Sequence, residues 1–291
     1  MSYHKMLTIN YKTRNSLISK LLEKENIKEV KKPSFFSKLF GKKEFADIYF
    51  HSGNLDEQSL ENIKKAKKVF VNSQTVHHEL LKKFQENLDK VEVLYPSVNV
   101  EYKKPKEVKL AFCEKQNIDP KKKIVFFTAK NFKTSGVKEF ISIVLQLSSE
   151  NYIAVIEGDK KQITNLRFQL SKINVEDKIL LLEDYANKDD LFLASDIFIL
   201  PTYSKNFASN ILKAMYCKCA VFVTASNPAK ELVDIFSMME SPDDRSMQFK
   251  VEALLQNKND LKLIKKQNRK IAKEYSLANA LIKVEKSIST L

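Results

Sequence analysis

Four lysines follow the ends of predicted strands or lie in the helices beyond them, at Lys130, Lys133, Lys205 and Lys213. A lysine ammonium carries three hydrogen-bond donors and no acceptor, so a group of lysines suits an anion. Helix N-termini also favour anions, because their first amides lack partners within the helix. The spacing predicts a pocket for a nucleotide, a phosphate or a partner's carboxylate. The alternative is a set of solvated lysines beside an unused cleft, with Lys213 pointing to water.

The elements that would bring these lysines together are short apolar strands that alternate with amphipathic helical segments. This alternation is typical of a parallel α/β sheet. Doubly wound sheets bind ligands at the carboxyl ends of their strands, so we expect residues 128–135, 157–159, 183–185 and 201–206 along one edge. Strands are predicted at residues 6–11, 47–51, 69–72, 91–94, 124–128, 152–157, 179–182, 197–200 and 221–224.

Length and composition allow one large or two medium domains, since the chain has 291 residues and 43% of them are hydrophobic. Pro96 and the later run KKPKE indicate a boundary, which divides the chain into residues 1–100 and 101–291. The net charge of +14 comes almost wholly from lysine. Arginine is better suited to bidentate recognition of bases, and no nucleic-acid-binding motif is present, so only charge favours nucleic acid as a partner.

The cysteines and acidic pairs do not predict a metal site. Three cysteines, an odd number, argue against a disulfide framework and for a reducing compartment. Cys217 and Cys219 have no matching pair and are expected to be small buried hydrophobes. Asp189 and Asp190 are expected to cap a helix. No apolar run reaches membrane-spanning length, so we expect a cytoplasmic protein, with peripheral attachment to the inner face of a membrane as the alternative.

The stretch from Pro201 to Thr224 reads PTYSKNFASNILKAMYCKCAVFVT. It resembles the donor-site motif E-G-F-G-x-x-x-x-E-A-M of retaining glycosyltransferases with the GT-B fold, and Phe207, Ala214 and Met215 match it directly. Further landmarks of family-four glycosyltransferases follow in order: IVFFTAKNFKTSGVKEFI (124–141), AVIEGD (154–159), KILLLEDYANKDDLFLASDIFILPTY (178–203) and NPAKELV (227–233). From about residue 108 onward the chain therefore resembles their nucleotide-sugar-binding domain.

The first domain resembles a reduced acceptor-binding domain, through ADIYFHSGN (46–54), KKVFVNSQTVHHELLKKF (67–84) and KVEVLYPSVN (90–99). No counterpart is evident for the strands expected between the first helix and residue 46. The resemblance implies a GT-B-like α/β fold, with two Rossmann-like domains built on parallel sheets. It also places His51 where relatives have an acceptor-side histidine. The alternative for His51 is a strand-end histidine satisfied by its neighbours.

The resemblance also implies roles for the donor-site positions, and this chain departs from them. Lys205 and Lys213 stand where two carboxylates are expected, the first to position the sugar and the second to accept hydrogen bonds from ribose hydroxyls. Asn206 and Ala208 replace loop glycines. Lys130 and Ser135 take the positions of an arginine and a lysine that hold the diphosphate, with Lys133 nearby. The candidate site consists of Lys130, Lys133, Ser135, Lys205, Asn206, Phe207 and Lys213.

These replacements predict a catalytically inactive homologue that serves as a partner or scaffold subunit of a complex and needs no cofactor. A lysine cannot accept hydrogen bonds from hydroxyls, so Lys205 and Lys213 cannot replace carboxylates. The alternative is an active retaining glycosyltransferase with an unusual donor site. Such an enzyme would move a hexose from a nucleoside diphosphate sugar to a surface glycan or a lipid-linked acceptor.

The segment PSFFSKLFGKKEF (33–45) predicts an amphipathic helix. Its apolar face would carry Phe35, Phe36, Leu39 and Phe40, flanked by Lys38, Lys42 and Lys43. This pattern suits an anionic membrane surface or a protein partner. The alternative is a helix packed on its own domain.

Overall fold

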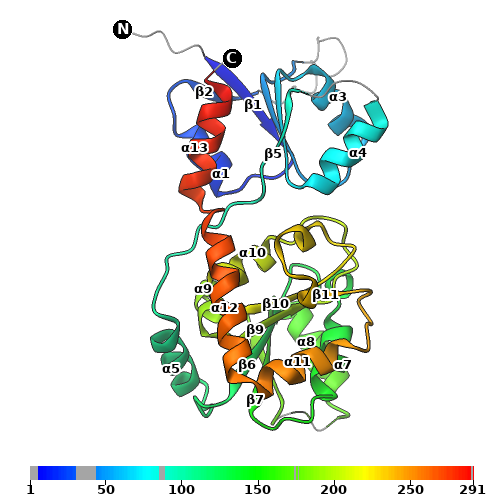
Figure 1. Cartoon of the computed structure of the whole chain (residues 1–291), viewed down its shortest axis with the longest axis vertical. Helices are drawn as coiled ribbons and strands as arrows, with labels where there is room; N and C mark the ends of the chain where they lie inside the picture. The colour runs from blue at the N-terminus through cyan, green and yellow to red at the C-terminus, as the bar shows by residue number, and fades with distance from the viewer. Residues whose placement is uncertain (1–5, 31–43, 85–88, 174, 176, 290) are drawn as a thin grey trace. The chain divides into compact units, whose positions relative to one another are not determined.

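The structure is a computed structural model that describes residues 6–30, 44–84, 89–173, 175, 177–289 and 291 (Figure 1). The chain divides into two compact units, an N-terminal unit of Met1–Asn99 with Tyr275–Leu291, and a second unit of Val100–Glu274. Each unit contains one sheet, and the strand pairings in both sheets are parallel. The predicted α/β fold with two parallel sheets is confirmed.

The sheet of the N-terminal unit has helices on both faces. The strand order is β2 (Ile27–Glu29), β1 (Leu7–Tyr11), β3 (Ile48–His51), β4 (Lys68–Val71) and β5 (Val91–Val93). Side chains alternate across a strand, so Ile48 and Phe50 pack towards one face and Tyr49 towards the other. The helices are α1 (Ser16–Leu22), α3 (Glu57–Lys65), α4 (Gln74–Phe84) and α13 (Leu277–Ile288).

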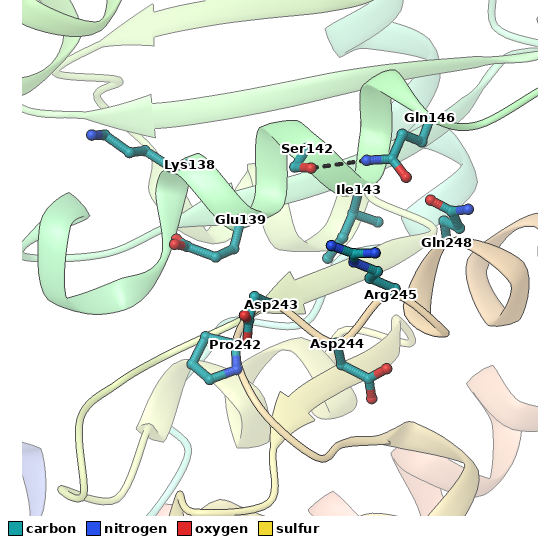
Figure 2. Close-up of a pocket in the computed structure, with 10 residues that line it drawn as sticks. All are labelled: Lys138, Glu139, Ser142, Ile143, Gln146, Pro242, Asp243, Asp244, Arg245 and Gln248. Carbon is teal, nitrogen blue, oxygen red and sulfur yellow. Dashed lines mark hydrogen bonds between the residues drawn. The ribbon is translucent and has the colours of Figure 1, made fainter.

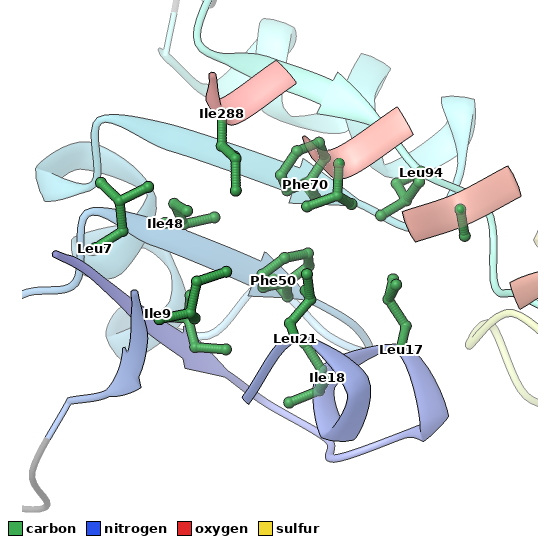
Figure 3. Packing of buried hydrophobic residues seen from close by; sticks show 13 residues of the cluster. Leu7, Ile9, Leu17, Ile18, Leu21, Ile48, Phe50, Phe70, Leu94 and Ile288 are labelled. Carbon is green, nitrogen blue, oxygen red and sulfur yellow. The ribbon is translucent and has the colours of Figure 1, made fainter. Parts of the chain in front are cut away.

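Two features of this unit differ from the sequence prediction. β2 pairs in register with β1, although no strand was expected there; of its residues only Ile27 is buried, so it lacks an apolar run. α13 packs in this unit, although residues 275–291 were assigned to the second domain. Its apolar stripe, which includes Val284 and Ile288, packs in one core with residues of α1 such as Leu21 (Figure 3).

The second unit contains a six-stranded sheet with a buried centre. Its strand order is β11 (Met238–Met239), β10 (Ala220–Thr224), β9 (Ile197–Leu200), β6 (Lys123–Thr128), β7 (Tyr152–Gly158) and β8 (Ile179–Glu183). The helices are α5 (Pro105–Lys115), α6 (Phe132–Ser135), α7 (Val137–Leu145), α8 (Lys160–Leu170), α9 (Lys188–Ala194), α10 (Ser209–Tyr216), α11 (Met247–Gln256) and α12 (Lys258–Lys273). Parallel strands place all their carboxyl ends at one edge, which we call the carboxyl edge.

No helix among the described residues is long and apolar enough to cross a bilayer. The amphipathic segment falls largely outside the described part of the chain. Its candidate residues Phe35, Phe36, Lys38, Leu39, Phe40, Lys42 and Lys43 therefore stay a sequence prediction.

Candidate functional site

Hydrogen bonds bring the predicted loops together at the carboxyl edge. The amide of Tyr203 donates to the carbonyl of Thr134 over 3.0 Å, which joins the loop after β9 to α6. Asn210, in the first turn of α10, donates to the carbonyl of Thr128 at the end of β6 over 3.3 Å. The Thr128 hydroxyl donates in turn to Glu157 of β7 over 2.7 Å. The amide of Asp184 donates to the carbonyl of Gly158 over 2.9 Å, so all four predicted segments meet.

Two glycines allow these loops to approach closely. Gly136, before α7, has φ +80, and a Cβ there would lie 1.8 Å from the carbonyl oxygen of Pro201. A Cβ on Gly158 would lie 2.4 Å from the ring of Phe132. A side chain at Gly136 would separate the elements that form the edge, whereas one at Gly158 would displace the Phe132 ring.

A single buried side chain fixes the loop that carries Lys205 and Asn206. Asn227 has no exposed surface, and its amide nitrogen donates to the carbonyls of Ser204 and Asn206, each over 2.8 Å. Its side-chain oxygen accepts from the amides of Ala208 at 3.1 Å and Ala229 at 3.0 Å. Neither Asn206 nor Ala208 has a positive φ, so the loop accommodates both side chains without backbone strain.

Lys213 forms an ion pair, contrary to the alternative that it points to water. Its Nζ lies 2.6 Å from Oδ1 of Asp189, in the first turn of α9, and 5.7 Å from the centre of the Phe192 ring. Asp189 is therefore an ion-pair partner, although a capping role was expected. Asp190 bonds the Asn187 side chain at 2.9 Å and the Lys103 ammonium at 2.8 Å.

The other predicted cations at this edge are exposed. Lys130 and Lys205 lie on loops and Lys133 lies in α6, and the three ammonium groups have no hydrogen bond or ion pair within the described residues. Ser135 and Phe207 are half-buried. The structure thus brings the loops of the candidate site together, while Lys213 is already paired.

Glu157 is a buried carboxylate at this edge that the sequence analysis did not single out. Its side chain has no exposed surface, and Oε1 lies 2.8 Å from Nζ of Lys188, which is itself about half exposed. Oε1 forms an ionic contact there, without hydrogen-bond geometry. The sequence contained a signal for this residue, because Glu157 directly follows the apolar run YIAVI within the buried strand β7.

Two cavities flank α7. One, of about 690 Å³, lies between α6, α7 and α8 and is lined by polar groups that include Lys133, Gln162 and Tyr203. The other, of about 500 Å³, lies between α7 and the segment that contains Arg245 (Figure 2). Both include Glu139, whose carboxylate accepts a 2.8 Å hydrogen bond from the Tyr203 hydroxyl. The first cavity is lined by residues of the candidate site and its loops, and the second adjoins it through Glu139.

His51 is buried at the end of β3 in the N-terminal unit. Its Nε2 contacts the carbonyl of Gly53 at 3.1 Å, and its Nδ1 has no hydrogen-bond partner in the described part of the chain. Burial lowers the pKa of His51 to about 4, so the ring is neutral near pH 7. The contact of Nε2 agrees with the alternative that His51 is a strand-end histidine satisfied by its neighbours. The same alternative does not account for Nδ1, which has no such neighbour among the described residues.

The three cysteines are buried, free thiols. Burial raises the pKa of Cys217 to about 12, which makes its thiol a poor nucleophile and a poor metal ligand. Among the described residues no group of three or more His, Cys, Asp or Glu side chains is placed to hold a metal ion.

Comparison with known families gives one match. Residues 108–271, more than half of the chain, match the model of the family described as glycosyl transferases group 1. The matched span begins where the sequence resemblance to the nucleotide-sugar-binding domain begins. No curated protein sequence matches the chain.

Several solved structures share the fold at low sequence identity. HepE from Anabaena, in complex with UDP and glucose, has a TM-score of 0.73 at 12% identity, covering 99% of this chain and 100% of that one. A glycosyltransferase from Rickettsia africae ESF-5 has a TM-score of 0.72 at 17% identity, with 98% and 78% covered. WaaG, a glycosyltransferase involved in lipopolysaccharide biosynthesis, has a TM-score of 0.67 at 13% identity, with 96% and 85% covered.

Proposed function

Because the chain belongs to the group 1 glycosyltransferase family, we propose that it is a member that does not transfer sugar and serves as a partner subunit of a complex. The observation that carries this proposal is the 2.6 Å ion pair between Lys213 and Asp189. Lys213 stands where the family resemblance implies a carboxylate for ribose hydroxyls. An ammonium offers no acceptor to a hydroxyl, and here it is already bound to a neighbouring helix.

The surrounding loop supports the same proposal. Lys205 occupies the position of the other expected carboxylate and is exposed to solvent. Asn206 and Ala208 replace the expected glycines, and Asn227 holds this loop through its backbone. The loop therefore has a stable structure of its own, in which side chains occupy positions where relatives let a ligand approach the backbone.

Titration calorimetry with UDP-, GDP- and ADP-glucose tests the proposal. UDP-glucose comes first, because the similar HepE structure contains UDP and glucose. We expect no saturable binding at the carboxyl edge, that is, no binding at millimolar donor that Lys130→Gln with Lys133→Gln weakens. Micromolar binding of one donor, together with release of free sugar, would overturn the proposal. A variant with both carboxylates restored, Lys205→Glu and Lys213→Glu with Asp189→Asn to avoid repulsion, should gain donor affinity. Asp189→Asn alone is the matched control and should gain none.

A second candidate function is an active retaining glycosyltransferase that moves a hexose from a nucleoside diphosphate sugar to a surface glycan or a lipid-linked acceptor. The exposed ammonium groups of Lys130, Lys133 and Lys205 favour it, because cations on adjacent loops suit a diphosphate. In that case Lys130→Gln with Lys133→Gln would weaken UDP binding at least tenfold, about 1.4 kcal/mol. The exposed Lys172→Gln would leave UDP binding unchanged.

The partner is a protein or an anionic membrane surface, and residues 35–43 are the proposed contact. Deleting this segment should release the protein from its complex or membrane fraction in a native extract, measured by size-exclusion chromatography and by flotation. A chain without the segment that fractionates like the full chain would remove residues 35–43 from the proposal. Failure to recover any stoichiometric partner with the full chain would contradict the role as a subunit.

A further inference from the structure

A second group of lysines lies at the edge of the six-stranded sheet where the strands begin. Lys123 is the first residue of β6, Lys218 precedes β10, and four more lysines belong to α12. With Asp196 and Leu261 they line a cavity of about 310 Å³. We call these lysines the basic hollow, which comprises Lys123, Lys218, Lys258, Lys262, Lys265 and Lys266.

The positive charge of the basic hollow is mostly uncompensated. Asp196 is the one acidic residue in the described lining, and it is 6% exposed. Its two oxygens already bind Lys265 and Lys109, each at 2.7 Å, and Oδ2 also accepts from the amide of Ile124 at 3.1 Å. The other five ammonium groups of the hollow have no hydrogen bond or ion pair among the described residues.

Crowding of like charge is visible at Lys123. Burial lowers the pKa of this half-buried ammonium, Asp196 opposes that effect, and the charges of Lys109, Lys265 and Lys258 lower the pKa further. Like charges in a partly desolvated space repel more strongly than in water, and a bound anion would relieve that repulsion.

Lys218 provides an independent observation. It follows α10 with φ +64, in the left-handed region, where its amide donates to Met215 at 3.1 Å and the Cys219 amide donates to Ala214 at 2.9 Å. This pair of bonds is the Schellman motif, whose left-handed position usually carries glycine because a Cβ is strained there. Lysine at this position strains the backbone and adds a cation to the hollow.

We propose that the basic hollow binds a ligand that carries two or more phosphate groups. Such a ligand places several negative charges within a few ångströms of one another, which matches clustered ammonium groups better than a monovalent anion does. A lysine ammonium attracts phosphate as a point charge, so the basic hollow can bind phosphate without the bidentate geometry that arginine provides. The site lies at the edge opposite the carboxyl edge, so it is independent of the proposed function.

Calorimetry with inorganic tripolyphosphate on the full chain tests this site, at low salt and again at about 0.15 M salt. We expect saturable binding that Lys218→Gly and Lys262→Gln each weaken about threefold to fivefold, the effect of losing one ion pair. Lys218→Gly should also raise the melting temperature, because glycine relieves the strained φ. Its weaker binding therefore cannot result from unfolding.

Lys270→Gln is the matched control, since Lys270 is exposed on the same helix and outside the hollow. Tripolyphosphate that does not bind saturably, or that Lys270→Gln weakens as much as Lys262→Gln, would overturn the proposal. Co-sedimentation with cardiolipin vesicles distinguishes a lipid headgroup from a free ligand. If tripolyphosphate displaces the protein from vesicles and Lys218→Gly weakens vesicle binding, the phosphate groups that the hollow binds belong to a lipid headgroup. Absence of vesicle binding, with tripolyphosphate bound, identifies a free phosphate compound.

Discussion

At the carboxyl edge of the six-stranded sheet Lys213 pairs with Asp189 and Lys188 with Glu157, whereas at the opposite edge Asp196 alone faces the basic hollow. The composition gives a net charge of +14 but does not say where that charge is available. The sequence predicted an anion pocket at the carboxyl edge. The structure adds a larger group of uncompensated lysines at the other edge. The lysines of the two edges differ in how deeply they are buried and in whether they are paired with a carboxylate.

The comparison also separates two kinds of stabilisation. At the carboxyl edge, the neutral amide of Asn227 holds the loop after β9 through bonds to the backbone. At the opposite edge, a buried carboxylate with two lysines joins β6, α5 and α12. The stability contributed by neutral hydrogen bonds changes little with salt and pH, whereas the stability contributed by a group of charged side chains depends on both.

Removing the charge of Asp196 should have the largest effect. Asp196→Asn leaves Lys109 and Lys265 part-buried without a counter-charge, which typically costs on the order of 3–5 kcal/mol of unfolding free energy. Urea unfolding measures the loss, with the exposed Glu114→Gln as the control. A loss below about 1 kcal/mol would mean that the lysines relax into solvent, and the basic hollow would then be less crowded than described.

Replacing Asn227 should be the next largest change. Asn227→Ala breaks four hydrogen bonds and leaves four buried or part-buried backbone groups unpaired, a loss of about 3 kcal/mol by thermal or urea unfolding. Asn210→Ala, which removes one hydrogen bond at the same edge, should cost about 1 kcal/mol. A salt-dependent loss for Asn227→Ala would contradict the neutral character assigned to the hydrogen bonds of Asn227.

Lowering the pH should weaken the edge that contains Asp196. Burial alone would raise the pKa of Asp196, but Lys265 and Lys109 lower it to about 2. Its contribution is therefore present above the unfolded pKa near 4 and is lost as the pH falls towards 2, a change of about 2 kcal/mol. The stability difference between wild type and Asp196→Asn should narrow between about pH 4 and pH 2. A constant difference would exclude Asp196 as the titrating group.

The buried carboxylate at the carboxyl edge should contribute less. Lys188 is half exposed, so water screens its pair with Glu157, and Lys188→Gln should cost about 1 kcal/mol. Glu157→Gln in the same background should recover most of that loss, because no unpaired charge is then buried. A double-mutant cycle by urea unfolding measures the coupling. Additive losses would show that Lys188 does not compensate Glu157.

The strands and helices could be predicted because apolar runs and caps are local signals. β2 was missed because one buried residue, Ile27, makes no pattern. The apolar stripe of α13 is visible in the sequence, but the stripe does not reveal which unit covers it. Both errors have the same cause. The formation of β2 and the position of α13 each depend on contacts with residues that are distant along the chain.

The same cause limited the prediction of the candidate site. The loops were located correctly because strand ends mark them, and Tyr203, Thr134 and Asn210 bring them together. The state of each cation could not be predicted, because Lys213 meets Asp189 only through the packing of α10 and α9. Asn227 belongs to the landmark NPAKELV, but that motif does not reveal that its side chain bonds Ser204, which lies on another loop.

The pair of Lys213 and Asp189 should have the smallest effect on stability, although the proposed function depends on it. Both side chains are 32% exposed, so the pair should contribute roughly 0.5 kcal/mol in a cycle of Lys213→Gln and Asp189→Asn. The coupling should shrink as salt rises from about 0.05 M to 1 M, because screening acts on exposed charges. Zero coupling at low salt would mean that Lys213 is free. The carboxyl edge would then present a fourth available cation, and the contrast between the two edges would narrow.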